Sequence, residues 1–476
     1  MEEFKLSESV DNNKVFIVYR SELISRLDAT VYKDAFHFKS KVYPVFKLSD
    51  LVFINPTTPF NNLPPDQEIT FVPMEAINED LGTIISNYSK TVYESKGYTR
   101  FKEKDLIWAK ITPCMQNGKS AIVERSINGY ACGSTEFFII RPKNNEVLIE
   151  YIHYILRDER ILKTAMNFFG GSAGQQRVSK DFLLNLQTPL PPLDIQRKIV
   201  NIINDAYSQK QQKETEAKDL LDSIDDYLLG ELGITLPNED DEENELSIAA
   251  EPKSSYGNSD GFELDKENLL VKKGRLFLTY FSEIEGRRWD VFEVINRSKK
   301  IEGGKYPNRK LKQVANLVKG QSITSDKIIS GEYPVIAGGQ TSPYSHNQFN
   351  FEGDIITISA SGAYSGYVWY HNYSIFASDC TVVFAKNENE ISTIFLSEIL
   401  KLKQQEIYNL QQGAGQPHVY ARDLATLNIP VPSISKQAEI IQHISTVRAK
   451  SKQLYKEAKT VLENAKNEVE NMILGN

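Results

Sequence analysis

The chain has 476 residues, 41% of them hydrophobic, which is enough for two to four domains that each bury an apolar core. The first ten residues carry acids where a signal peptide would carry positive charge, and no apolar run approaches the ~20 residues that a bilayer span needs. The three cysteines (Cys114, Cys132 and Cys380) lack CxxC spacing, which argues against a disulfide framework and a zinc site. We therefore expect a protein of the reducing cytoplasm.

The net charge of −8 at first argues against nucleic acid as a partner. However, seven acids and no base lie between Glu239 and Glu251, so the rest of the chain is close to neutral. A near-neutral protein can still present basic faces. The charge therefore leaves a nucleic-acid partner open.

The chain contains an internal repeat. Residues 173–203 align without gaps with residues 414–444, and 11 of the 31 aligned positions are identical. Shorter upstream stretches also correspond, namely 15–28 with 276–290 and 101–107 with 351–356. Repetition on this scale predicts two modules of roughly 200 residues each.

Both modules show the same order of elements. Each begins with stretches rich in Val, Ile, Tyr, Phe and Thr, broken by Gly, Pro and Asn, which predict short strands and turns. A Pro-x-Pro pair follows, at Pro189 and Pro191 in the first module and at Pro430 and Pro432 in the second. Beyond each pair, apolar residues recur at helical spacing.

The helical spacing predicts two long helices, from about Leu193 to Glu231 and from about Ile434 to Leu474. Both apolar stripes are typical of coiled-coil partners; the first begins with Ile195, Ile199, Ile202 and Ala206. Between the modules, an acidic stretch rich in Ser, Gly and Asn predicts a flexible linker. The expected division is residues 1–190, 191–235 (central helix), 236–270 (linker), 271–431 and 432–476 (C-terminal helix).

Several catalytic motifs occur only in outline. Pro113 replaces the first glycine of a phosphate-binding loop, and Gly413 stands in the repeat where Ser172 would be the nucleophile of a GxSxG turn. Asp66, Glu94 and Lys96 loosely match a PD…ExK nuclease set that would hold Mg²⁺. We expect a non-catalytic chain without a metal site, with a standalone nuclease as the alternative.

The loops at 170–177 and 412–420 precede the Pro-x-Pro pair in both modules and combine glycines with Gln, Arg and His. Gln can pair bidentately with adenine and Arg with guanine in the major groove, whereas Lys110 and Lys119 could neutralise phosphates. Ordinary solvated loop residues are the alternative, and Tyr and Ser in Gly-rich loops also suit protein recognition.

The candidate DNA-binding residues have polar or aromatic side chains and lie in these two loops or in the predicted loops at 110–119, 338–348 and 359–367. They are Lys110, Thr112, Gln116, Asn117, Lys119, Ser172, Gln175, Gln176, Arg177, Gln340, Thr341, Ser361, Tyr364, Gln416, His418 and Tyr420.

The duplicated order of a variable β-rich domain, a Pro-x-Pro stretch that leads to a glutamine (Gln196 and Gln437), and a long helix resembles the specificity subunits of type I restriction-modification systems. TPCMQNGKSA and GSTEF in the first module, and YPVIAGGQTSPY and GDIITIS in the second, resemble stretches common in that family. The resemblance covers nearly the whole chain. It implies an α+β fold with two target-recognition domains, whose long helices pack as an antiparallel coiled coil in a pseudo-twofold repeat.

The resemblance also implies a function. Each domain would read one half of a split site in double-stranded DNA, and the helices would set the spacing and dock two modification (methyltransferase) subunits. Restriction subunits would join the larger assembly. S-adenosylmethionine, ATP and Mg would be bound by these partner subunits, with no cofactor in this chain. A coiled-coil protein scaffold without DNA specificity is the second alternative.

Overall fold

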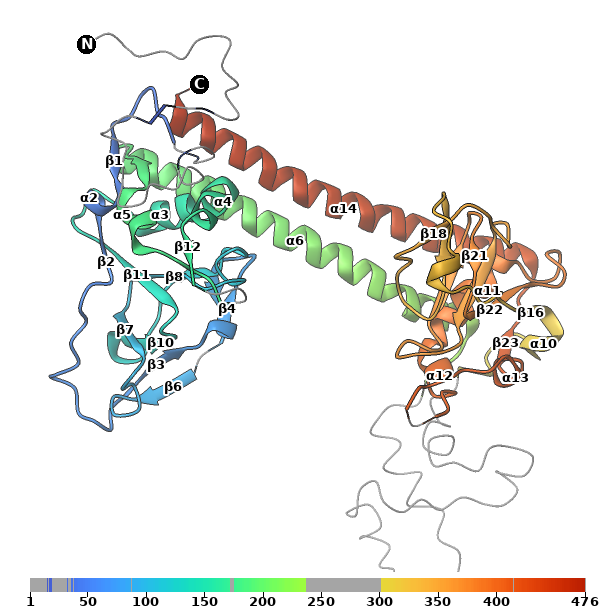
Figure 1. Ribbon diagram of the computed structural model, residues 1–476. Coiled ribbons are helices and arrows are strands. Elements are labelled where there is room, and N and C mark those ends of the chain that lie inside the picture. The colour runs from blue at the N-terminus through green and yellow to red at the C-terminus, as the bar shows by residue number, and fades with distance from the viewer. Residues whose placement is uncertain are drawn as a thin grey trace, which may run out of the picture. The chain divides into compact units, whose positions relative to one another are not determined.

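A computed structural model describes residues 38–86, 88–171, 175–236, 301–413 and 415–475, together with Val15, Ile17, Val18, Tyr32 and Phe36. The chain forms two compact units, Met1–Thr215 with Tyr455–Asn476, and Glu216–Leu454 (Figure 1). Each unit thus holds one module and one half of each long helix. The repeat segment 276–290, most of segment 15–28 and the acidic linker beyond Leu236 lie outside the described residues.

In the first unit, short strands and helices precede a long helix. The strands are β1 (Val45–Lys47), β2 (Val52–Ile54), β3 (Glu68–Val72), β4 (Ile77–Asn78), β5 (Thr83–Ile84), β6 (Tyr88–Thr91), β7 (Thr99–Lys102), β8 (Leu106–Ala109), β9 (Ser120–Ile122), β10 (Tyr130–Gly133), β11 (Phe137–Pro142), β12 (Phe169–Gly170), β13 (Arg177–Val178) and β14 (Gln187–Pro189). The helices are α2 (Leu48–Leu51), η2 (Met74–Ala76), η3 (Ile127–Gly129), α3 (Ile149–Leu156), α4 (Glu159–Met166), α5 (Lys180–Asn185) and α6 (Leu193–Leu232).

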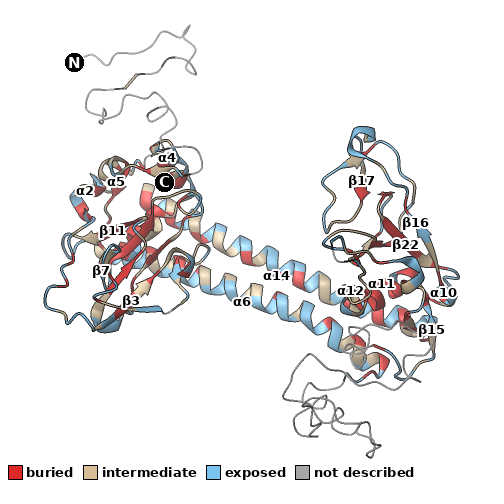
Figure 2. Ribbon diagram, turned by 60° about the horizontal axis from the view of Figure 1, so that its bottom comes forward, coloured by how far each residue is buried: buried red, intermediate tan, exposed pale blue. Residues whose placement is uncertain are grey.

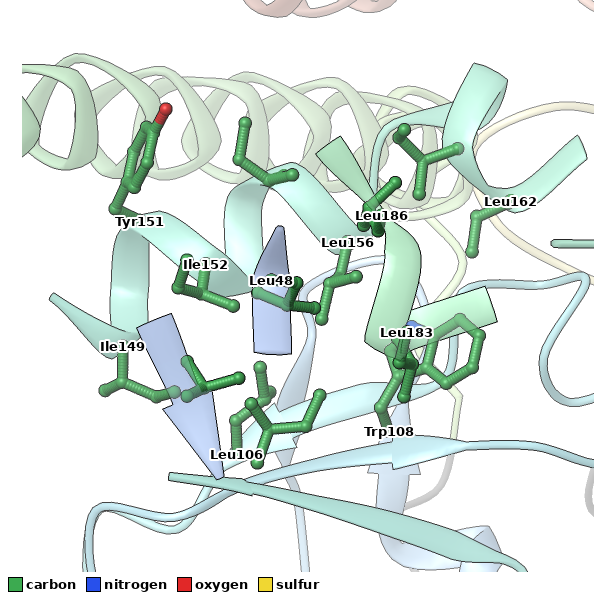
Figure 3. Close-up of a cluster of buried hydrophobic side chains, with 14 of the residues drawn as sticks. Leu48, Leu106, Trp108, Ile149, Tyr151, Ile152, Leu156, Leu162, Leu183 and Leu186 are labelled. Carbon is green, nitrogen blue, oxygen red and sulfur yellow. The ribbon is translucent and has the colours of Figure 1, made fainter. Parts of the chain in front are cut away.

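Two four-stranded sheets, β6-β3-β10-β7 and β2-β11-β8-β9, organise this unit. Leu106 and Trp108 of β8 are at most 1% exposed and pack under α3 and α5, as Figure 3 shows. Aromatic rings fill this core: Trp108 stacks between Phe138 and Phe182 with centroids 6.3 and 6.2 Å away. The buried sheet therefore fixes where the loops at the ends of β8 and β11 emerge.

The second unit has a similar order of elements. Its strands are β15 (Asn308–Lys310), β16 (Ala315–Lys319), β17 (Tyr333–Ile336), β18 (Ser345–His346), β19 (Ile355–Ser359), β20 (Val368–His371), β21 (Phe376–Ala377), β22 (Cys380–Ala385) and β23 (Asn428–Pro430). Its helices are α10 (Leu311–Val314), η4 (Ser325–Lys327), α11 (Thr393–Leu402), α12 (Gln404–Tyr408), α13 (Ala421–Leu424) and α14 (Ile434–Leu474).

Sheet topology repeats between the units. The sheet β2-β11-β8-β9 of the first corresponds to β16-β22-β19-β20 of the second, and all pairings in both sheets are antiparallel. The first described strand of each module also pairs with the strand that ends at the first proline of the Pro-x-Pro pair, β1 with β14 and β15 with β23. In both modules, this pairing therefore brings an early strand next to the strand that directly precedes the long helix.

The halves of α6 and α14 pack antiparallel within each unit. In the first unit, Lys213 pairs with Glu457 at 2.6 Å, and Ile199 and Ala206 share a core with Val469. In the second, Ser451 Oγ donates to Ala217 O at 2.8 Å. Figure 2 shows buried positions recurring along both helices. The expected α+β fold with an antiparallel helix pair is confirmed.

A buried glutamine anchors each long helix to its module. Gln196 Nε2 donates to Glu146 O and Pro191 O at 2.9 and 2.8 Å, and its Oε1 accepts from Leu148 N at 2.9 Å. Gln437 repeats the arrangement with Glu390 O, Pro432 O and Ser392 N. Each amide thus ties the start of α6 or α14 to the start of α3 or α11. Within the described residues, no helix is both long and apolar enough to cross a membrane.

Candidate nucleic-acid interface

Three segments of the first module meet at the end of β8. Lys110 N donates to Glu136 O at 2.9 Å, and Lys110 O accepts from Val178 N at 2.9 Å. Thr112 N donates to Gln176 O at 3.0 Å, and Ile111 forms a bridge with Arg177. Two of the predicted loops, far apart in sequence, are therefore joined through backbone hydrogen bonds. We call this three-segment contact the junction of the module.

The second module builds the same junction at the end of β19. Ala360 N donates to Asp379 O at 3.2 Å, Val419 N to Ala360 O at 3.1 Å, and Gly362 N to Pro417 O at 3.1 Å. Ser361 forms the bridge with His418 that Ile111 forms with Arg177. The two junctions thus share their backbone hydrogen bonds and differ in their side chains.

A carboxylate side chain lies in each junction, and sequence reasoning did not select either one. Glu136 accepts from Arg177 Nε at 2.9 and 3.1 Å and from Nη2 at 2.8 Å. The Arg177 guanidinium holds the pKa of Glu136 below its ordinary value, so this carboxyl stays ionised at neutral pH. In the second junction, Asp379 Oδ2 accepts from Ser361 Oγ. Glu136 belongs to the GSTEF stretch, which was the available signal in the sequence.

Aromatic and cationic side chains surround the second junction. The His418 and Tyr420 rings stack with centroids 6.1 Å apart, and the Arg422 guanidinium lies 4.7 Å from the Tyr420 centroid. Tyr420 and Tyr364 are 41% and 47% exposed, so their rings can be reached by a ligand. A Cβ added at Gly338 would lie 2.5 Å from Ser361 O, so the segment that leads to Gln340 and Thr341 packs closely on this junction.

Other predicted residues lie away from the first junction's carboxylate. Asn117 Nδ2 donates to Glu79 at 3.3 Å and Lys119 Nζ to Met74 O at 3.4 Å. Gln116 and Gln416 are exposed, and Ser172 lies outside the described residues. Gln175 is also exposed, but its backbone carbonyl accepts from Arg177 Nη1 at 3.2 Å. The structure thus forms two separate candidate sites. Lys110, Thr112, Gln176 and Arg177 lie in the junction of the first module. Ser361 and His418 lie in the junction of the second.

The residues of the alternative nuclease site take part in local contacts. Glu94 accepts from Thr91 N and Oγ1 at 2.8 and 3.0 Å, which lowers its pKa, and Lys96 Nζ lies 4.4 Å from the Tyr93 ring. Among the described residues, no three His, Cys, Asp or Glu side chains group closely enough to hold a metal ion. The nuclease alternative therefore gains no geometric support.

A cleft of about 760 Å³ in the first unit lies between the module and the helix pair. Its lining includes Arg157, Arg160 and Lys466, but equal numbers of acidic and basic side chains line it. Arg160 is already paired with Asp158 and Glu470 at 2.7 and 2.6 Å. This balance of charge does not favour phosphate binding, and none of the predicted DNA-binding residues line the cleft.

The family described as type I restriction modification DNA specificity domain matches the chain twice, at residues 40–220 and 304–464. The two matches span more than half of the chain, and the chain belongs to this family. Its fold is also similar to a chain solved in work on complex assembly and conformational transition of the type I R-M system. That similarity has a TM-score of 0.52 at 15% identity and covers 90% of this chain and 96% of the other.

Among curated proteins, the chain is similar to the specificity subunit of the type I restriction enzyme EcoEI of Escherichia coli, with 33% identity over 177 residues. The specificity subunit of the EcoAI enzyme, also from Escherichia coli, is 33% identical over 189 residues. These alignments cover 37% and 39% of this chain and only 30% and 32% of the two relatives. The chain therefore aligns with about a third of the length of these relatives.

Proposed function

We propose that this chain is the DNA-recognition subunit of a type I restriction-modification system, in which each module reads one half of a bipartite site. The observation that carries the proposal is the duplicated junction. Its backbone hydrogen bonds are the same in both modules, whereas Arg177 stands where the other module has His418. A repeated framework with different side chains suits two half-sites of unequal sequence. Membership of the specificity family supports the same reading.

The chain itself is non-catalytic in this proposal. Its partners are double-stranded DNA, two modification (methyltransferase) subunits and restriction subunits, and these subunits carry S-adenosylmethionine, ATP and Mg. The target-recognition domains span 1–190 and 271–431, separated by the helix at 191–235 and the linker at 236–270. The helices dock the modification subunits, which is supported by the curated relatives being specificity subunits.

We place the protein in the cytoplasm. All three cysteines are free, and burial raises the pKa of Cys132 to about 11 and that of Cys380 to about 12. A thiol with so high a pKa remains protonated and unreactive at neutral pH. These thiols act as small core residues, which suits a reducing compartment.

The test uses the chain co-purified with a co-expressed methyltransferase subunit. Duplexes selected from a random library at moderate salt should contain two short sequences separated by a fixed run of unspecified bases. Arg177→Ala should relax one half-site only, and His418→Ala the other only. These two variants serve as matched controls for each other, since each leaves the opposite junction intact.

Three results would contradict the proposal. A complex with no sequence preference would favour the protein-binding scaffold. Cleavage of DNA by the purified chain with Mg²⁺, abolished by Glu94→Ala, would favour the nuclease. A loss of both half-sites in either single variant would show that the junctions do not read DNA separately.

A further inference from the structure

The carboxylate of Glu136 binds Arg177 from the side of the guanidinium. Nε and Nη2, which share one edge of the planar group, both donate to Glu136, at 2.9 and 2.8 Å. Nη1 donates to Gln175 O at 3.2 Å. The Arg177 side chain is 42% exposed and that of Glu136 is 22% exposed, so the pair lies at the surface. The guanidinium is thus fixed along one edge and at one corner.

The contacts with Glu136 and Gln175 leave part of the guanidinium available to a ligand. A guanidinium has five N–H donors, and three of them are used by Glu136 and Gln175. Among the described residues, the other two, one on Nη1 and one on Nη2, have no hydrogen-bond partner. The free N–H of Nη2 lies at the tip of the group, next to Nη1, because the other N–H of Nη2 is on the edge that Glu136 occupies. Donors on the neighbouring Nη1 and Nη2 atoms can bind the O6 and N7 acceptors of guanine.

The backbone holds the carboxylate in place independently of its side chain. Glu136 directly precedes β11, and its carbonyl accepts from Lys110 N at the end of β8. Asp379 has the same position before β22, where its carbonyl accepts from Ala360 N. Both acids therefore face the junction because of sheet register, which is fixed by the buried core.

We propose that Glu136 is a positioning residue that sets guanine recognition by Arg177 in one half-site, and that Asp379 has the corresponding role through Ser361 in the other. This inference rests on the proposed function. Without Glu136, the long Arg177 side chain would sample many rotamers and lose its fixed orientation on the base edge.

Glu136→Gln tests the proposal in the co-purified complex, with base preference measured at every position of the selected duplexes. We expect the guanine preference to fall by about 5- to 150-fold at one base pair, which corresponds to the loss of a good bidentate contact. The other half-site should not change. Asp379→Asn should affect only that other half-site, and Glu68→Gln, an exposed acid of β3, should affect neither.

A double-mutant cycle separates positioning from direct reading and from structure. Arg177→Lys keeps the charge but lacks the planar fork, so it should lose the same guanine preference. If Glu136 acts through Arg177, the double variant should match Arg177→Lys alone. Additive effects, or a changed cytosine preference in Glu136→Gln, would overturn the proposal, because they would mean that the acid reads a base itself.

Three outcomes separate the proposed function from the positioning role of Glu136. If the wild-type complex selects no sequence, the proposed function is wrong. If the wild type selects a bipartite site and Glu136→Gln selects the same one with the same preferences, only the positioning role is wrong. A Glu136→Gln complex that loses both half-sites and also melts at a lower temperature would assign the acid a structural role and overturn the proposal as well.

Discussion

At the scale of single residues, the glutamine shared by both repeats has a structural role. Gln196 is fully buried, Gln437 is 1% exposed, and each uses its amide group to bind two carbonyls and one N–H. Buried polar groups that lose a partner destabilise a fold more than the hydrogen bond itself contributes. The residue that carried much of the family resemblance thus anchors a helix and does not face the candidate interface.

Replacing this glutamine should destabilise the first unit. Gln196→Leu would leave two carbonyls and one N–H without partners, and we expect the free energy of unfolding to fall by about 2–4 kcal/mol. Urea unfolding followed by circular dichroism measures the change. Gln211→Leu, at an exposed position of the same helix, should change stability by less than about 0.5 kcal/mol. Equal effects of the two variants would contradict the anchoring role.

His371 makes the stability of the second unit depend on pH. Its side chain is fully buried, its Nε2 lies 2.8 Å from Thr357 Oγ1, and burial lowers its pKa to about 4, with Lys401 adding to the effect. The unfolded chain, with an ordinary histidine pKa near 6.5, therefore binds the proton first as the pH falls. This contribution to stability is complete above about pH 6.5 and is lost progressively between about pH 6.5 and 4.

The variant His371→Gln should remove that contribution. We expect the slope of unfolding free energy against pH, between pH 6 and 4.5, to be smaller than in the wild type by up to roughly 1.4 kcal/mol per pH unit. Gln442→Ala, at an exposed position of α14, should leave the slope unchanged. An unchanged slope in His371→Gln would mean that the imidazole is not held neutral.

At the scale of elements, small residues allow α6 and α14 to approach closely. Ala217 and Ala458 are fully buried, and Ser451 Oγ reaches the backbone carbonyl of Ala217. Ion pairs also join the two helices, Lys213–Glu457 in the first unit and Lys436–Glu231 in the second, each at 2.6 Å. Exposed pairs contribute little, so the buried small residues decide the packing.

A larger side chain at this contact should separate the helices. Ala217→Leu would insert three carbons where a backbone carbonyl and a serine already pack, and we expect a loss of about 1–3 kcal/mol. Thermal unfolding of the full chain measures it. Ala449→Leu, at an exposed position of α14, is the matched control and should have little effect. A stabilised Ala217→Leu variant would show that the contact contains unfilled space.

At the scale of the whole molecule, the proposed function predicts that the two helices set the spacing between the half-sites, as a ruler would. They contain 40 and 41 residues, which corresponds to roughly 60 Å each. Two modules that read one face of a duplex would prefer half-sites about one turn, near 10 base pairs, apart. The length of the helix pair would then fix the number of unspecified bases between the half-sites.

Lengthening both helices should change the spacing alone. Two heptads inserted after Gln209 in α6, with a matching pair at the opposing position of α14, lengthen each helix by roughly 21 Å. Whole heptads also keep the apolar faces of the two helices in contact. Genome-wide mapping of methylated sites should then show a longer unspecified run with both half-sites unchanged. A continuous recognition sequence, or altered half-sites at constant spacing, would contradict the ruler.

The sequence alone determined the duplicated plan, the α+β class and the two long helices. These features follow from local patterns, because apolar periodicity and a gapless repeat can be read without knowing distant contacts. The buried face of the first long helix nevertheless differs in detail from the predicted apolar stripe. Ile199 and Ile203 are buried, whereas Ile195 and Ile202 are only partly covered. Apolar spacing alone treats these residues as equivalent. The position of the helix against its neighbour decides which of them are buried.

Only the tertiary structure decided which loop residues meet. It joined Lys110 to Val178, brought Glu136 to Arg177 across 41 residues of sequence, and directed Lys119 to Met74. These contacts depend on sheet register and on backbone hydrogen bonds between distant segments, which no local spacing encodes. Glu136 lies within the GSTEF stretch, but only the backbone hydrogen bonds of the junction show that its side chain contacts Arg177.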